Sequence, residues 1–275
     1  MKTFITKHPV AAFIILTFAI SFLIGFPLKL FILNQLFRGQ ELGLNYYSKI
    51  FIVFGPALAA IIVTSVTSGK AGITALLGKL KPNTKHLIWW LALPVTGTLL
   101  TMLAFMIQGA TTQEMISAIV KNRGLFLAHL ALTTLIIGIG EELGWRGWLL
   151  PRLSKGRTIT SAILMVFIIW ALWHFPLLLS GYKVAIPFLI INLSMSIIFT
   201  CVWQRVNGNI FVLAIAHASV DFPEAFFESR ALATGHSWND ILNMWAVLSI
   251  IYAVPAIIVF FTLIAPKSPE GHLHI

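Results

Sequence analysis

The segment "IGIGEELGWRGWLLPRL", residues 137–153, decides how this chain folds, because it places two adjacent glutamates and an arginine inside a long apolar run. An ionisable side chain at the centre of a bilayer costs about 2.5–3.5 kcal/mol on insertion scales. Such groups therefore face the protein interior, where they usually form a functional site. The rest of the sequence shows whether this run lies in a membrane.

The composition is that of an integral membrane protein. The chain has 275 residues, of which 58% are hydrophobic and 10% charged, against roughly 45–50% and about 25% in soluble domains. Apolar runs of about 20 residues can span a bilayer. We therefore predict an all-α polytopic helix bundle of about eight transmembrane helices, forming a single domain over residues 1–275 of a cell-membrane protein. The predicted spans are about 9–30, 50–67, 87–108, 124–150, 159–179, 185–204, 210–229 and 243–264.

The net charge of +10 is explained by topology. The basic residues are scattered among the connections and form no stripe, so we expect the lipid bilayer as a partner and no nucleic acid. They are in excess on the side of the N-terminus, which predicts cytoplasmic N- and C-termini. The stretch "GKAGITALLGKLKPNTKH" between the second and third spans is either a basic amphipathic helix on the inner surface or a charged loop. The single cysteine, Cys201, excludes a disulfide framework and a multi-cysteine metal site.

Helical spacing organises the charged groups of the fourth span. Glu142 and Arg146 lie four residues apart and share one face, where pairing lowers the burial cost of each. Glu141 is rotated by about 100° from its neighbour, so it can face a different space. The alternative is that the Glu142–Arg146 pair is purely structural and fixes the packing between helices without taking part in a reaction.

Two further spans carry histidines. His174 lies in the fifth span, and His217 lies four residues before Asp221 in the seventh. A carboxylate without a cationic partner, close to imidazoles, can act as a general base toward water. We therefore predict that Glu141 and His174 activate water, while His217 and the residue at 221 stabilise an oxyanion.

Other polar and aromatic side chains are given structural interpretations. His129 is expected at the interface, Asn192 in a hydrogen bond between helices, and Glu224 outside the site. Hydrogen-bonded core histidines remain an alternative for His174 and His217. The tryptophans of the fourth and fifth spans are expected to pack and to anchor the interface; these are Trp145, Trp148, Trp170 and Trp173.

These residues resemble the CPBP intramembrane endopeptidases, which include the CAAX prenyl proteases and the bacterial Abi proteins linked to bacteriocin processing and immunity. The family motif E-E-x-x-x-R is similar to Glu141, Glu142 and Arg146. The aromatic-x-x-x-His motif resembles the segment from Trp170 to His174, with tryptophan in place of phenylalanine. The motif His-x-x-x-Asn or Asp resembles the segment from His217 to Asp221, and the motif core covers about residues 120–230.

The resemblance implies a different role for each group of side chains. The first glutamate and the second-motif histidine activate the hydrolytic water, the third-motif pair helps to form the oxyanion hole, and Glu142 with Arg146 shapes the site. Asp221 stands where the family often has asparagine, and an ionised aspartate cannot donate a hydrogen bond to an oxyanion. It is either protonated or accepts a hydrogen bond from His217 and holds that imidazole as the donor; we favour the second.

We therefore predict an intramembrane glutamate-type endopeptidase without a cofactor, acting on a membrane-associated peptide or protein in a cavity open to the membrane and the cytoplasmic side. Two alternatives stay open. The same Glu, His and Asp side chains are plausible zinc ligands, although H-E-x-x-H is lacking. Intramembrane Glu and His also suit a proton-coupled transporter or a non-enzymatic immunity factor. The sequence predicts neither the substrate nor the oligomeric state.

Overall fold

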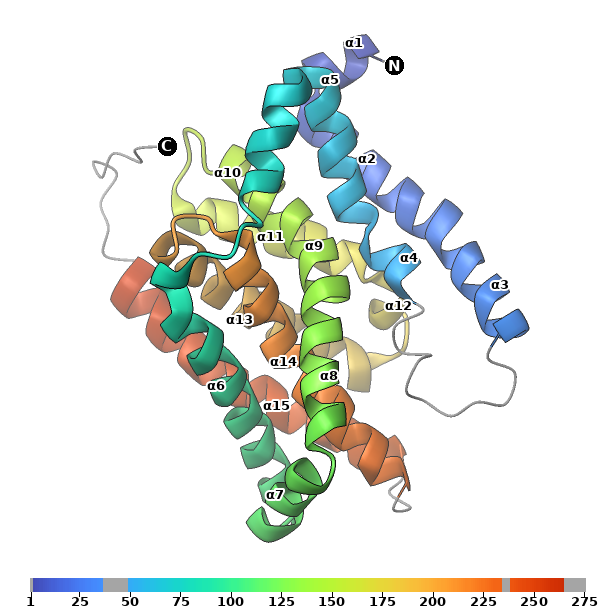
Figure 1. Cartoon of the computed structure of the whole chain (residues 1–275), viewed down its shortest axis with the longest axis vertical. Coiled ribbons are helices and arrows are strands. Elements are labelled where there is room, and N and C mark those ends of the chain that lie inside the picture. Colours follow the sequence, from blue (N-terminus) through green and yellow to red (C-terminus); the bar gives the residue numbers. More distant parts are fainter. Residues whose placement is uncertain (1, 37–48, 234–237, 265–275) are drawn as a thin grey trace.

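The chain folds as a bundle of helices (Figure 1). The computed structural model describes residues 2–36, 49–233 and 238–264, and this part of the chain contains no strand. Its N-terminal half consists of α1 (Lys2–Lys7), α2 (Pro9–Phe18), η1 (Ala19–Gly25), α3 (Phe26–Leu36), α4 (Ile50–Val53), α5 (Gly55–Gly78), η3 (Thr84–His86), α6 (Leu87–Ile107), α7 (Thr112–Lys121) and α8 (Arg123–Thr133).

The C-terminal half carries the polar segments. It consists of η4 (Thr134–Gly138), α9 (Ile139–Gly144), η5 (Trp145–Leu149), α10 (Leu150–Leu153), α11 (Ile159–Trp173), α12 (Phe175–Leu178), α13 (Tyr182–Arg205), α14 (Ile210–Ala233), α15 (Trp238–Val259) and η6 (Phe260–Ile264). An all-α polytopic bundle is thereby confirmed.

Among the residues that the structure describes, six helical stretches are long and apolar enough to cross a membrane: Pro9–Phe31, Ile50–Gly78, Thr84–Ile107, Arg123–Leu153, Tyr182–Arg205 and Leu242–Thr262. The predicted fifth and seventh spans correspond to shorter apolar helices, Ile159–Trp173 and Ile210–Pro223. His174 and His217 come from these two. The total of eight spans and the cytoplasmic termini stay predictions, as does the single domain.

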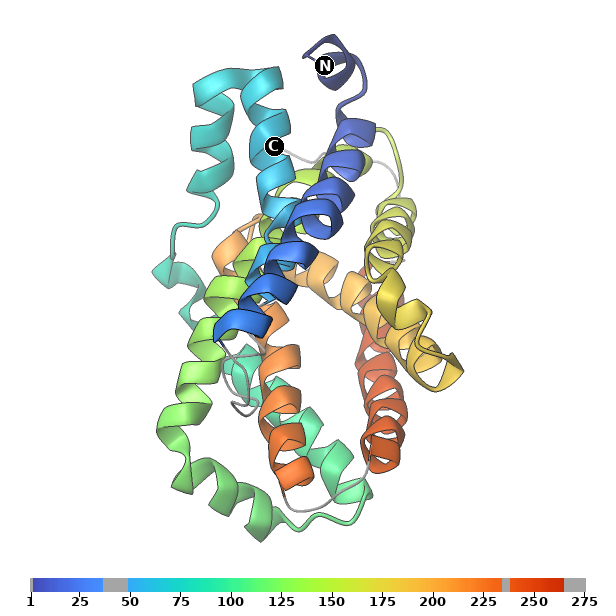
Figure 2. The ribbon, with the colours of Figure 1, turned by 90° about the vertical axis from the view of Figure 1, so that its right-hand side faces the viewer.

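Helix α5 reverses direction near its middle. Gly69 has φ +60° and ψ −156°, a conformation that suits glycine because it has no Cβ. Figure 2 shows the chain rising through the first limb of α5 and descending through the second. Residues 70–78 of the basic connection are therefore helical, and they return toward the body of the protein instead of extending the second span.

A lysine at the end of α5 holds the motif helix in place. Pro151 has no N–H, so the Gly147 carbonyl lacks the partner that residue 151 would supply in a regular helix. The Lys79 ammonium donates to this carbonyl at 2.9 Å. The Lys79 carbonyl accepts from the backbone N–H of Ile210 at 2.8 Å, at the start of α14. One residue thus ties α5 to η5 and to α14, two of the segments that carry predicted site residues.

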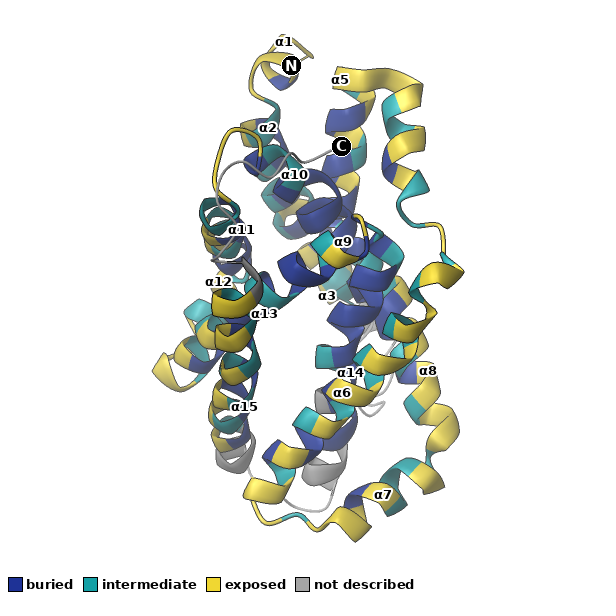
Figure 3. Ribbon diagram, turned by 90° about the vertical axis from the view of Figure 1, so that its left-hand side faces the viewer, coloured by how far each residue is buried: buried dark blue, intermediate teal, exposed yellow. Residues whose placement is uncertain are grey.

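Aromatic packing fills the core between the first helices and the motif helix. Phe13 stacks on Trp148 with ring centroids 4.6 Å apart, and the Trp148 indole donates to the Thr64 hydroxyl at 3.0 Å. The Trp173 indole likewise donates to Ser21 at 3.0 Å. Figure 3 shows the buried residues gathered around α9, α10 and α14, whereas the outer helices are largely exposed. The expected packing role of these two tryptophans agrees with these contacts.

Gly138 allows η4 and α14 to touch. A Cβ at this position would overlap the Ala214 backbone, and overpacking of this kind costs about 1–3 kcal/mol. We expect Gly138→Ala to lower the unfolding temperature of detergent-purified protein. Gly124→Ala is the matched control, because a Cβ at 124 would meet nothing within 4 Å, and its effect should stay within about 0.5 kcal/mol. Equal stability of the two variants would contradict this close contact.

Candidate active site

Four of the six predicted site residues line one cavity. Glu141 on α9, His174 at the end of α11, and His217 and Asp221 on α14 surround a space of about 430 Å³. Much of the remaining lining is apolar or aromatic, with side chains from η1, α3, α11, α12 and α13. Glu142 and Arg146 lie behind this wall and are completely buried. The structure thus brings the three sequence motifs together around one space.

Glu141 is held by two indoles. Its carboxylate Oε2 accepts from Trp170 Nε1 at 2.8 Å and from Trp145 Nε1 at 3.4 Å. The residue is 3% exposed and sits on α9, between two π-helical turns. π-Turns within helices are frequent at functional sites. The indoles fix one oxygen of the carboxylate, and Glu141 reaches the cavity with a defined orientation.

Glu142 joins an arginine and a histidine from different helices. Its Oε1 lies 2.9 Å from Arg146 Nη1 and 2.8 Å from His217 Nδ1. The Arg146 guanidinium also lies over the Trp170 ring, 4.3 Å from its centroid. Within the described residues, Glu142 Oε2 and the Nε and Nη2 of Arg146 have no hydrogen-bond partner. The predicted pair on one helix face is confirmed, and it also orients a histidine on α14.

His174 lies directly after α11, where the helix has ended. Its Nδ1 is 3.0 Å from the backbone carbonyl of Trp170, which can only accept, so Nδ1 carries the proton in this hydrogen bond. A neutral imidazole of this tautomer has its lone pair on Nε2. His174 therefore offers the cavity an acceptor that can take a proton from water.

His217 is bound more closely by Glu142 than by Asp221. Its Nε2 lies 3.8 Å from Asp221 Oδ2, which is within ion-pair distance but beyond a hydrogen bond. The predicted hydrogen bond between these two residues is therefore not formed. With 28% of its side chain exposed, Asp221 also has access to water. Glu142 performs the orienting role that the sequence assigned to Asp221.

Two comparisons bear on this arrangement. Residues 123–223 match the family described as "Type II CAAX prenyl endopeptidase Rce1-like", and this segment contains all three motifs. A protein named CAAX prenyl protease 2 from Methanococcus maripaludis is 29% identical over 126 residues, which cover 40% of this chain and 44% of that protein. The part of the chain that carries the motifs is thus similar to the CAAX prenyl endopeptidases. The alignment thus spans less than half of the length of this relative.

Trp170 has a larger role in this site than packing. Its ring centroid lies 5.9 Å from that of His174 and 5.7 Å from that of His217. Together with its hydrogen bond to Glu141 and its contact with Arg146, these distances place it at the centre of the site. One signal for this role was present in the sequence, since Trp170 occupies the aromatic position of the aromatic-x-x-x-His motif. The spacing of the motif could not show which side chains the indole ring contacts.

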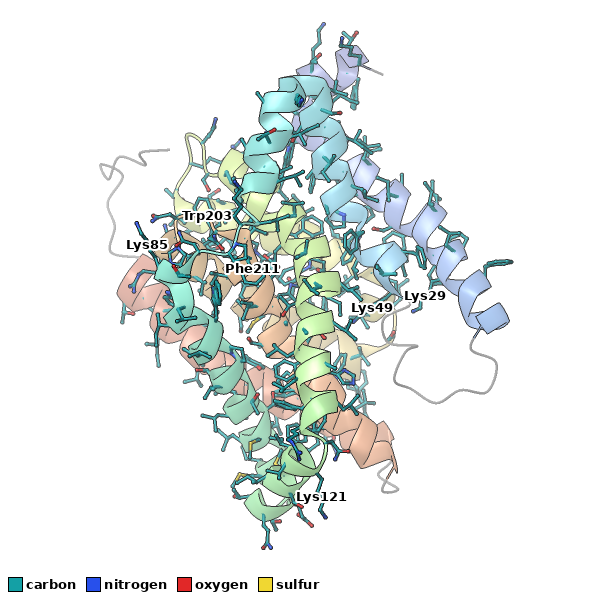
Figure 4. The ribbon with its side chains drawn as sticks, in the orientation of Figure 1. Lys29, Lys49, Lys85, Lys121, Trp203 and Phe211 are labelled. Atoms are coloured by element: carbon teal, nitrogen blue, oxygen red, sulfur yellow. The ribbon has the colours of Figure 1, made fainter. Side chains whose placement is uncertain are left out.

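Three further polar residues line the cavity and were not predicted there. Asn192 from α13 is one of them. Lys29 of α3 and Lys49, which precedes α4, are the others, and Figure 4 shows these two lysines near one another. In the sequence, these lysines contributed only to the balance of positive charge between the two sides of the membrane.

The arrangement of donor side chains bears on the zinc alternative. Among the residues that the structure describes, no group of three or more His, Cys, Asp or Glu side chains is arranged to hold a metal ion. His217 Nδ1 already faces Glu142 at 2.8 Å. The donor set therefore gives no support to a zinc centre, and the absence of a cofactor stays a prediction.

Proposed function

We propose that this protein is an intramembrane endopeptidase that hydrolyses peptide bonds with a water molecule activated by Glu141 and His174. One observation carries the proposal: a buried carboxylate and an imidazole whose Nδ1 is already engaged line the same cavity. The family match supports membrane proteolysis as the class of activity. The glutamate mechanism and the substrate are our own inferences.

The reaction follows from the acceptors and donors in the cavity. Water donates to Glu141 or to His174 Nε2 and attacks the scissile carbonyl carbon as its proton passes to that base. The carbonyl oxygen becomes an oxyanion, which needs hydrogen-bond donors. The base then returns a proton to the leaving amine nitrogen, and the C–N bond breaks. The products are a carboxylic acid and an amine, which become carboxylate and ammonium by proton exchange, and both bases regain their starting state.

The cavity lining favours an apolar substrate segment. Its walls include Phe22, Phe26, Phe188 and Trp245 beside the polar residues. Aromatic walls hold apolar side chains or a lipid chain equally well. We therefore propose a membrane-associated peptide or protein as substrate and include prenylated peptides among those to test, because the name of the Methanococcus relative refers to a prenyl protease.

The test is cleavage of a quenched-fluorescence peptide library, including prenylated members, by detergent-purified protein. Cleavage that survives a strong chelator and disappears in Glu141→Ala is the expected result. Cleavage lost with the chelator and recovered with zinc would establish the metalloprotease alternative instead. No cleavage by folded wild-type protein would favour a transport or binding function.

Asp221 is expected to be dispensable for the chemical step. Because Glu142 holds His217 by the shorter contact and Asp221 is partly exposed, the 3.8 Å pair should contribute little. We expect Asp221→Asn to change kcat/KM by less than about tenfold, the range of a weak ion pair. Complete loss of cleavage by folded Asp221→Asn protein would restore a distinct role for the aspartate.

A further inference from the structure

Asn192 is a buried amide on the wall of the cavity. It lies on α13, is 2% exposed, and lines the same cavity as Glu141. Its Oδ1 is covered and has no hydrogen-bond partner among the residues that the structure describes. The hydrogen bond between helices that the sequence predicted for Asn192 is therefore absent from this part of the chain. A buried polar group of this kind is costly to the fold and needs an explanation.

The position of Asn192 along α13 places it between the two histidines. Phe188 contacts His174 at a ring separation of 5.0 Å, and Phe199 contacts His217 at 5.7 Å. Both phenylalanines line the cavity, as Asn192 does. At about 1.5 Å of rise per residue, Asn192 lies about 6 Å along the helix from Phe188 and about 10.5 Å from Phe199. Its amide thus stands at the level where a peptide held between the histidines would lie.

The cavity offers few neutral donors near the two bases. The carboxylates of Glu141 and Asp221 can only accept when ionised. His217 directs Nδ1 to Glu142 and can donate from Nε2 only when both ring nitrogens carry protons. A side-chain amide donates from Nδ2 in any protonation state of the site. With Oδ1 covered, Nδ2 is the atom of Asn192 that is left to reach the cavity.

We propose that Asn192 is a catalytic residue whose Nδ2–H donates to the oxyanion that forms on the scissile carbonyl. This inference rests on the proposed peptidase function and adds the donor that the reaction requires. The donor contributes mainly in the transition state, when negative charge develops on the oxygen. It therefore affects kcat more than KM.

Two variants remove the donor in different ways. Asn192→Leu replaces the amide by an apolar group of similar size, and Asn192→Asp keeps the shape but removes the N–H. We expect kcat to fall by about 10²–10³-fold in both, the usual loss for one oxyanion donor, with KM changed only a few-fold. We also expect the unfolding temperature of Asn192→Leu to equal or exceed that of the wild type, because the substitution removes an unpartnered buried polar group.

Asn122→Leu is the matched control. The Asn122 amide donates to the Ala118 carbonyl at 2.9 Å, at the end of α7 and away from the cavity. Its loss should lower stability and leave kcat unchanged. A catalytic amide is indicated if Asn192→Leu keeps or raises the unfolding temperature while kcat falls. A structural amide, as at Asn122, is indicated if the unfolding temperature falls while kcat is unchanged.

Three outcomes would overturn the inference. One is an unchanged kcat in both Asn192 variants. Another is a raised KM with kcat retained, which would make Asn192 a binding residue only. The last is a loss of kcat in Asn192→Leu that is accompanied by a lower unfolding temperature and is absent from folded Asn192→Asp. Wild-type protein that cleaves no peptide would instead refute the proposed function itself.

Discussion

Replacing Glu141 with glutamine is expected to abolish peptide cleavage while leaving the fold intact. The glutamine carbonyl can still accept the hydrogen bond that Trp170 Nε1 donates to this position at 2.8 Å. It cannot take a proton from water at neutral pH, and loss of a general base typically reduces rates by about 10²–10⁴-fold. The measurement is kcat for a library-derived substrate, together with the unfolding temperature in detergent.

Glu114→Gln is the control for this substitution. Glu114 caps α7 through hydrogen bonds with Thr111 at 2.7 and 2.8 Å, and it lies outside the cavity. We expect this variant to retain wild-type kcat. Glu141→Gln protein that cleaves as fast as the control would mean that another group activates the water, with His174 Nε2 as the next candidate.

Replacing Arg146 with methionine is expected to destabilise the protein severely. The change leaves the buried Glu142 carboxylate with His217 as its remaining ion-pair partner. Removing one partner of a buried pair typically costs about 3–5 kcal/mol, because the other charge stays uncompensated. The double variant Glu142→Gln/Arg146→Met should recover part of this loss, since it removes both charges. The free energy of unfolding in detergent is the quantity to measure.

Arg123→Met serves as the comparison for Arg146. Arg123 is exposed, and its Nη1 donates a long hydrogen bond, 3.4 Å, to the Val120 carbonyl. Its loss should change stability by less than about 1 kcal/mol. If Arg146→Met were as stable as Arg123→Met, the buried pair would not hold the site together.

The sequence predicted local relations within the site better than distant ones. The spacing of Glu142 and Arg146 indicated a pair on one helix face, and the atoms lie 2.9 Å apart. The contact between Glu142 and His217 joins residues 75 positions apart, so helical periodicity could not foresee it. The hydrogen bond from Trp170 to Glu141 was missed for the same reason. Such contacts depend on how the helices pack, which the pattern of a single helix does not contain.

The hydropathy of the sequence indicated where the apolar helices lie but not the direction in which α5 continues after Gly69. Residues 50–78 form one continuous helical stretch by composition and length. The predicted end of the second span at about residue 67 agrees with the reversal at Gly69, but the direction in which the second limb returns depends on a positive φ that hydropathy does not contain.

Two predictions about orientation conflict with one another. The cavity is lined by Phe22, Phe26 and Lys29, which lie in the part of the first span remote from the N-terminus. A cytoplasmic N-terminus would place this part of the span toward the opposite side of the membrane. If the N-terminus is cytoplasmic, this arrangement therefore places the cavity toward the other side of the membrane. If the cavity opens to the cytoplasm, the N-terminus lies on the other side. Both stay predictions, and labelling of a cysteine at position 29 from each side would decide between them.

The most direct test of direct water attack is a single-turnover cleavage in ¹⁸O-labelled water with enzyme in excess. Mass spectrometry would follow the new carboxylate of the product and the peptide of the digested enzyme that contains Glu141. We predict one ¹⁸O in the product carboxylate and none in Glu141, because water attacks the scissile carbon directly. Label in Glu141 and an unlabelled first product would show that the glutamate itself attacks the substrate, and would contradict its role as a base.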